Sequence, residues 1–144
     1  GDSLGGFPFS GGEPLAQPEF LLQLIKELNN YNLCIETSGF AESEVFKEII
    51  DKLDFVIMDI KLADTEIHKK YTGVDNDLIL NNFKYLKQSG KPYIIRTPLI
   101  PNITDTKENL MAIKNIIGDS NWEQLPYNAA AGAKYKMLGM NYKL

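Results

Sequence analysis

The sequence has very few of the residues that hold metals or form disulfides: one cysteine, Cys34, and one histidine, His68, among 144 residues. A single cysteine cannot form an internal disulfide, so we expect a reducing, cytoplasmic setting. One cysteine and one histidine also argue against a zinc or iron–sulfur centre ligated by this chain alone, and against a Ser-His-Asp catalytic set. We expect Cys34 to be a small core residue in a strand.

Long apolar runs and an excess of basic charge are also missing. No run approaches the roughly 20 apolar residues of a membrane-spanning helix, so we expect no membrane insertion. The net charge of −4 argues against a nucleic-acid surface, which needs clustered Lys and Arg. Hydrophobic residues make up 44% and charged residues 24% of the chain, which is typical of a globular protein with a real core. The length predicts a single domain over 1–144.

Short apolar runs alternate along the chain with longer amphipathic segments. The apolar runs predict strands at 4–9, 33–36, 55–60, 93–99 and, more weakly, 122–125. The segments between them predict helices over about 18–28, 43–53, 65–71, 77–90 and 105–118. This alternation indicates a parallel sheet covered by helices, either an open doubly wound sheet or a barrel. Both folds place their chemistry at the carboxyl ends of the strands.

Polar and charged residues follow several of the predicted strands, and each has a purely structural alternative. Gly11 and Gly12 could only make a tight turn, and Glu36 could simply be solvated at a strand end. Asp59 and Lys61 are two positions apart on a strand and so point to one face, where they could form only a structural ion pair.

Arg96 could likewise be a structural partner for Glu36 or Asp59. His68, next to Lys69 and Lys70, is predicted to lie on a solvated helix face.

Six segments in order carry a closer resemblance: FSGGEPLAQPEF, IETSGF, DFVIMDIK, HKKYTGVDNDLILNNFKYL, PYIIRTPLIPNITDT and QLPYN. Together they resemble the activating enzymes of glycyl-radical enzymes, and most of all those of pyruvate formate-lyase, within the radical S-adenosylmethionine superfamily. The resemblance runs from about residue 6 to residue 142.

The resemblance implies an α/β fold, an incomplete TIM-like (β/α) barrel of the radical S-adenosylmethionine type with a parallel sheet. The family's C-x3-C-x2-C motif, which holds a [4Fe–4S] cluster, is absent here. We therefore expect a chain that lacks the first β/α unit, does not ligate the cluster and is inactive by itself.

The resemblance also implies a site for S-adenosylmethionine. The residues that match the family's contacts to this cofactor are Gly11, Gly12, Glu13, Glu36, Asp59, Lys61, Arg96 and Asn128. Asn128 replaces the histidine that follows L-P-Y in close relatives. A bound monovalent cation is implied near Glu36, Thr37 and Asp59.

The implied reaction of the intact enzyme is reductive cleavage of S-adenosylmethionine to a 5′-deoxyadenosyl radical, which takes a hydrogen atom from a glycine of the partner enzyme. That partner would be pyruvate formate-lyase or a homologue, and a flavodoxin or ferredoxin would supply the electron. Two alternatives stay open: a radical enzyme of the same superfamily that acts on a small molecule, and a cluster-free homologue that binds a nucleotide or a partner.

Overall fold

The computed structural model describes residues 7–9 and 13–126, with the side chains of Phe7 and Pro8 left aside. The predicted site residues Gly11, Gly12 and Asn128 lie outside the described residues. The strands are β1 (Phe7–Phe9), β2 (Leu33–Thr37), β3 (Phe55–Asp59), β4 (Tyr93–Pro98) and β5 (Trp122–Leu125). The helices are the 3-10 turn η1 (Pro14–Ala16) and α1 (Pro18–Glu27), α2 (Ser43–Asp51), α3 (Thr65–Thr72), α4 (Asp77–Ser89) and α5 (Lys107–Ile117).

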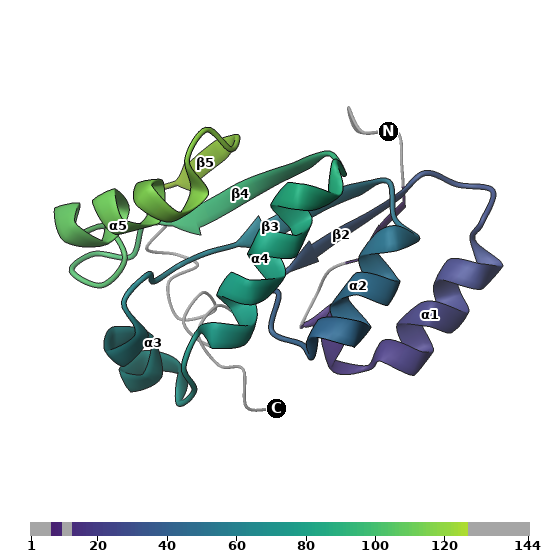
Figure 1. Ribbon diagram of the computed structural model, residues 1–144, viewed down its shortest axis with the longest axis horizontal. Helices are drawn as coiled ribbons and strands as arrows, with labels where there is room; N and C mark the ends of the chain where they lie inside the picture. Colours follow the sequence, from purple (N-terminus) through teal and green to yellow (C-terminus); the bar gives the residue numbers. More distant parts are fainter. Residues whose placement is uncertain (1–6, 10–12, 127–144) are drawn as a thin grey trace.

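The five strands form one parallel sheet in the order β1-β2-β3-β4-β5. A doubly wound sheet would reverse its strand order at a switch point, whereas a barrel adds each strand next to the previous one. Figure 1 shows α1, α2 and α4 side by side along one face of the sheet, with α3 beyond the end of β3. Sequential strands with helices along one face are the arrangement of a (β/α) barrel segment, so the predicted fold class is confirmed.

The hydrophobic core lies between the sheet and these helices. Alternate residues of β3, Val56 and Met58, are fully buried there against Phe46 and Ile49 of α2 and Phe83 of α4. The alternation leaves the other residues of each strand on the opposite, inner face of the sheet. Among the described residues, no helix is long and apolar enough to cross a membrane.

Local sequence signals account for the helix boundaries. Asp64 accepts a hydrogen bond from the backbone N–H of Ile67 at 2.9 Å and so caps α3 as predicted. Gly73 and Gly90 end α3 and α4 with φ of 87° and 79°, a backbone conformation that residues with a side chain rarely adopt. The predicted strands and helices are confirmed within the described residues, with boundary shifts of a few residues.

One burial prediction is wrong. His68 is only 2% exposed, although its neighbours in α3 are exposed lysines. Its position one turn before buried Thr72 places both side chains on the inward face of the helix. Phe20, at the edge of the apolar stripe of α1, is 61% exposed, whereas Leu21 and Ile25 on the same stripe are buried.

Candidate functional site

Charged side chains from neighbouring strands lie on the inner face at the carboxyl end of the sheet. The strand register places Asp59 of β3 beside Arg96 of β4, and Arg96 beside Glu123 of β5. Paired residues of adjacent strands point to the same side of a sheet. Glu36 of β2 belongs to the same group, because its carboxylate lies near the Arg96 guanidinium.

Arg96 lies between two carboxylates. Its Nε donates to Glu123 Oε1 at 2.6 Å, and its Nη1 lies 3.7 Å from Glu36 Oε1. The side chains of Arg96 and Glu36 are 29% and 45% exposed. Ion pairs that exposed are screened by water and stabilise a fold little. Their charges are therefore accessible at the inner face.

Lys61 and Asp59 form the second charged pair of this face, with Lys61 Nζ 2.8 Å from Asp59 Oδ2. The Lys61 side chain is only 3% exposed and that of Asp59 is 37% exposed. A buried ammonium is costly unless a carboxylate or hydrogen-bond acceptors surround it. The pairing confirms that the two side chains lie on the same side of the sheet, although β3 ends at Asp59 and Lys61 lies in the loop after it.

Glu13 lies beside this rim, but its carboxylate is bound by the chain itself. Oε2 accepts from the Thr37 hydroxyl at 2.6 Å and from Leu15 N–H at 2.9 Å. Oε1 accepts from the backbone N–H and the hydroxyl of Ser38, at 2.8 and 2.6 Å. The carboxylate thus joins the segment after β1 to the segment after β2.

Thr37 lies next to Glu36 in β2 and so points to the other side of the sheet. Its hydroxyl donates to Glu13 and accepts from the backbone N–H of Gly39 at 2.9 Å. That hydroxyl is therefore not directed at the Glu36 and Asp59 side chains. Within the described residues no group of three or more His, Cys, Asp or Glu side chains is arranged to hold a metal ion.

His68 belongs to α3, the helix that follows the loop of Lys61. Its Nδ1 is 2.8 Å from the carbonyl oxygen of Val74, which can only accept, so Nδ1 carries the proton. Burial lowers the pKa of His68 below its ordinary 6.5. The hydrogen bond to the Val74 carbonyl raises this pKa, the charge of Lys61 lowers it, and the charge of Asp75, the smallest cause, raises it. Burial therefore disfavours the charged form of this side chain.

Sequence reasoning missed three asparagines that hold the loops of this rim: Asn76 and Asn82 are buried, and Asn109 is half-buried. Asn82 donates to the carbonyls of Gly39 and Ala41, at 2.8 and 2.9 Å. Asn76 and Asn109 bind the loop after β3 in the same manner. No sequence signal separates them from exposed asparagines, because the loop carbonyls that they bind lie far away in sequence.

Glu123 was also missed. Strand alternation could have found it, because it occupies the register position of β5 that faces Arg96.

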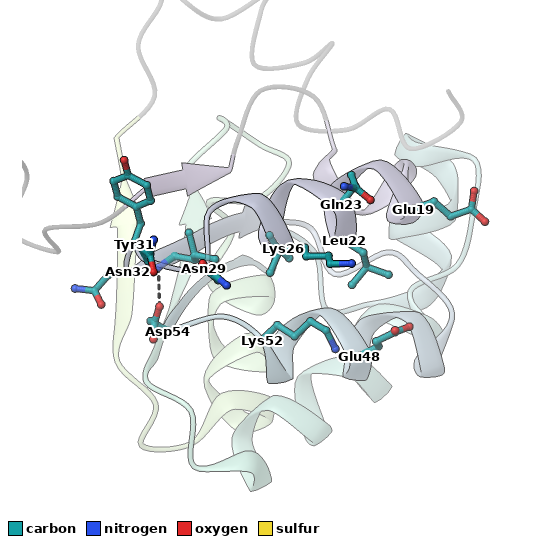
Figure 2. Close-up of a pocket in the computed structure, with 13 residues that line it drawn as sticks. Glu19, Leu22, Gln23, Lys26, Asn29, Tyr31, Asn32, Glu48, Lys52 and Asp54 are labelled. Atoms are coloured by element: carbon teal, nitrogen blue, oxygen red, sulfur yellow. Dashed lines mark hydrogen bonds between the residues drawn. The ribbon is translucent and has the colours of Figure 1, made fainter.

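A hollow of about 890 Å³ lies at the opposite end of the sheet, between α1 and α2. Figure 2 shows Lys26 of α1 and Lys52, directly after α2, along it, with Asp54 at one end. Asp54 Oδ2 accepts from the backbone N–H of Leu33 at 2.7 Å. The residues at this hollow belong to helix surfaces and to loops before the strands, so it is separate from the charged inner face.

The fold and the charged inner face define the class of protein: a (β/α) barrel segment with its polar groups at the carboxyl ends of parallel strands. Residues 4–112 match the Radical SAM superfamily, and the chain belongs to that superfamily. The barrel fold and the family expected from the six sequence segments are both confirmed.

Several similar proteins are named as activating enzymes. The chain is 40% identical to the (2S)-3-sulfopropanediol sulfolyase activating enzyme of Bilophila wadsworthia strain 3_1_6, over 97% of this chain and 49% of that protein. It is 38% identical to the 4-hydroxyphenylacetate decarboxylase activating enzyme of Clostridioides difficile strain 630, over 98% of this chain and 47% of that protein. The chain thus spans about half the length of these curated relatives.

A solved structure agrees with these relatives. A domain of the pyruvate-formate lyase-activating enzyme from Bacteroides vulgatus ATCC 8482 superimposes with a TM-score of 0.76 at 28% identity, over 88% of this chain and 83% of that one.

Proposed function

We propose that this chain is the S-adenosylmethionine-binding part of a radical activating enzyme whose partner is a glycyl-radical enzyme. The observation that carries the proposal is the set of charged groups on the inner face: Glu36, Asp59 and Glu123 with Lys61 and Arg96. The methionine end of S-adenosylmethionine has an ammonium, a carboxylate and a sulfonium close together. A face with both signs of charge at short spacing suits such a ligand.

Each charged residue has a definite part in this proposal. Glu36 and Asp59 are half-exposed carboxylates and can accept hydrogen bonds from the ligand's ammonium. Lys61 is a compact positive charge suited to the carboxylate or to ribose oxygens. Arg96, held by Glu123, adds positive charge beside Glu36.

Glu13 has a different part, because its four hydrogen bonds to the chain occupy both carboxylate oxygens. We assign it to holding the segment after β1 against the segment after β2, rather than to direct contact with the ligand. The roles of Gly11, Gly12 and Asn128, and of a cation near Glu36, Thr37 and Asp59, stay predictions from the resemblance.

The chain's own residues do not fit the family's [4Fe–4S] cluster. Cys34, the one cysteine of the sequence, is buried at 3% exposure in β2, and iron–sulfur clusters are usually held by several thiolates. We therefore derive no step at a cluster from this chain. Its residues bind and orient the ligand, while the cofactors supply the radical chemistry when bound.

The partner is proposed only as a class. The similar curated proteins are named for a sulfolyase and a decarboxylase, and the similar structure is named for pyruvate-formate lyase. Pyruvate formate-lyase stays our specific prediction, supported by that structural likeness. A flavodoxin or ferredoxin stays the predicted electron donor.

The test is binding of S-adenosylmethionine by the full-length protein that carries this sequence, with its cluster reconstituted without oxygen. Lys61→Ala removes a charged hydrogen-bond donor. We therefore expect the dissociation constant of S-adenosylmethionine from this variant, measured by calorimetry, to be about tenfold higher or more. Lys52→Ala removes an exposed lysine at the opposite end of the sheet and is the matched control.

Equal affinities of Lys61→Ala, Lys52→Ala and the unaltered protein would refute the assigned site. The activating role is tested separately, by electron paramagnetic resonance of a glycyl radical on candidate partner enzymes. A wild-type protein that binds S-adenosylmethionine but forms that radical on none of them, pyruvate formate-lyase included, would refute the activating role alone.

A further inference from the structure

One side chain joins the loop that carries Lys61 to the loop after the next strand. Asn109, in the first turn of α5, donates from Nδ2 to the carbonyl oxygens of Lys61 and Thr104, both at 2.8 Å. Its Oδ1 accepts from the backbone N–H of Ala63 at 3.0 Å. The carboxamide thus contacts the backbone on both sides of Leu62.

The loop after β3 depends on such contacts for its shape. Residues 60–64 form neither strand nor helix, so Lys61 lies beyond the regular hydrogen-bond ladder of β3. Asn76 supports the same loop from the start of α4, donating to the carbonyls of Leu62 and Ala63 at 3.3 and 3.0 Å. Asn109 is the one of the two that contacts Lys61 itself.

The position of Lys61 matters because its side chain is buried. Nζ lies 2.8 Å from Asp59 Oδ2, and the side chain is only 3% exposed. A charged group in such a place tolerates little displacement, because moving it away from its carboxylate leaves a buried charge with fewer partners. The anchor of Asn109 is itself fixed, since its backbone N–H donates to the Thr106 hydroxyl that caps α5.

We propose that Asn109 is a positioning residue for Lys61: it holds the Lys61 backbone so that the ammonium faces the ligand, and it couples that position to the loop after β4. This inference rests on the proposed function, in which Lys61 binds S-adenosylmethionine.

Asn82 provides a matched comparison within the same rim. Like Asn109, it donates to two loop carbonyls, but those belong to Gly39 and Ala41 after β2, and Asn82 is buried whereas Asn109 is half-buried. Replacing either asparagine by aspartate removes two hydrogen-bond donors with almost no change of shape. Asn109→Asp disturbs the loop of Lys61, whereas Asn82→Asp disturbs a different loop.

The experiment is a double-mutant cycle on S-adenosylmethionine affinity, measured by calorimetry on the full-length, cluster-reconstituted protein. Asn109→Asp is expected to raise the dissociation constant about fivefold to tenfold in the unaltered background. In the Lys61→Ala background, Asn109→Asp is expected to raise the dissociation constant less than about twofold, because the side chain that Asn109 positions is gone. Asn82→Asp is expected to act by the same factor in both backgrounds, within about twofold.

Asn115→Asp, an exposed change on the same helix, is the control for the added charge and should leave affinity unchanged. Thermal unfolding shows whether each variant is folded; if Asn109→Asp is not, the shorter and neutral Asn109→Ser takes its place in the cycle. An Asn109 effect that is equal with and without Lys61, or no effect at all, overturns the inference. A Lys61→Ala protein of normal affinity overturns the proposed site and the inference with it.

Discussion

The two ends of the sheet are built differently. At the carboxyl end, buried or half-buried side chains bind loop backbone: Glu13 holds Ser38, Asn82 holds Gly39, and Asn109 holds Lys61. At the amino end, the loops before β2 and β3 are mostly exposed and border the hollow between α1 and α2, and Asp54, which holds Leu33 there, is itself exposed.

The difference shows where this fold fixes its backbone. Helices and strands carry their own hydrogen bonds, but a loop holds one shape only if something binds its free carbonyls and N–H groups. Binding sites need groups held within a fraction of an ångström, and a rigid supporting layer provides that. Changes at the carboxyl end should therefore cost more than like changes at the amino end.

The largest effect is expected for Glu13→Gln. The carboxylate of Glu13 accepts four hydrogen bonds. The NH₂ group of glutamine is a donor, so it would face other donors and could not accept the bonds made by the oxygen that it replaces. We expect the free energy of unfolding, from denaturant titration, to fall by about 3 kcal/mol. Glu27→Gln, an exposed change where α1 ends at the amino end of the sheet, should change it by less than about 0.5 kcal/mol. Equal losses for the two variants would contradict the comparison.

Asn82→Ala should follow. It leaves the carbonyls of Gly39 and Ala41 without their donor, and Asn82 is only 1% exposed, so a cavity is left as well. We expect a loss of about 2 kcal/mol in the free energy of unfolding. Asn30→Ala at the exposed amino end is the matched substitution and should cost less than about 0.5 kcal/mol. A loss at Asn82 as small as that at Asn30 would show that the loop after β2 holds its shape without it.

Sequence patterns predicted the strands and helices at both ends of the sheet, but not the side chains that hold the loops. Apolar runs and cap residues such as Asp64 and Gly73 are local signals, so the strands and helices could be located from them. Same-face spacing also predicted the Asp59–Lys61 pair, and Glu36 was one of the two partners considered for Arg96.

The supporting layer could not be predicted because its contacts join distant parts of the chain. Asn109 binds Lys61 from 48 positions away, and Glu13 binds Ser38 from 25 positions away. Glu13 itself was expected at the rim, but its hydrogen bonds became visible only in three dimensions. His68 was mispredicted for a related reason, since the lysines beside it in sequence point to another side of α3.

The next effect concerns pH, and His68 is the one histidine of the sequence. Its folded pKa is lowered from 6.5, first by burial, so the unfolded chain binds the proton more readily than the folded one. The stability that the neutral imidazole contributes is present in full above the unfolded pKa and is lost as the pH falls towards the folded pKa. One proton gives a slope of at most about 1.4 kcal/mol per pH unit.

The measurement is the free energy of unfolding at pH 7.5 and pH 6.0. The unaltered protein should be less stable at the lower pH, and His68→Gln, which cannot take up a proton, should show a smaller difference. A pH dependence that is unchanged in His68→Gln would mean that other groups cause it.

The smallest effect is expected at the amino end itself, for Asp54→Asn. Asp54 Oδ2 accepts from Leu33 N–H at 2.7 Å, but Asp54 is exposed and an asparagine oxygen can accept the same bond. The free energy of unfolding should therefore change by less than about 0.5 kcal/mol, and S-adenosylmethionine affinity should stay the same. Asp59→Asn is the matched change at the other end. It replaces the carboxylate that pairs with buried Lys61 by an uncharged amide, so both the free energy of unfolding and the affinity for S-adenosylmethionine should fall. If Asp54→Asn lowered affinity as much as Asp59→Asn, the ligand site would not be confined to the carboxyl end, and the division between the two ends would be wrong.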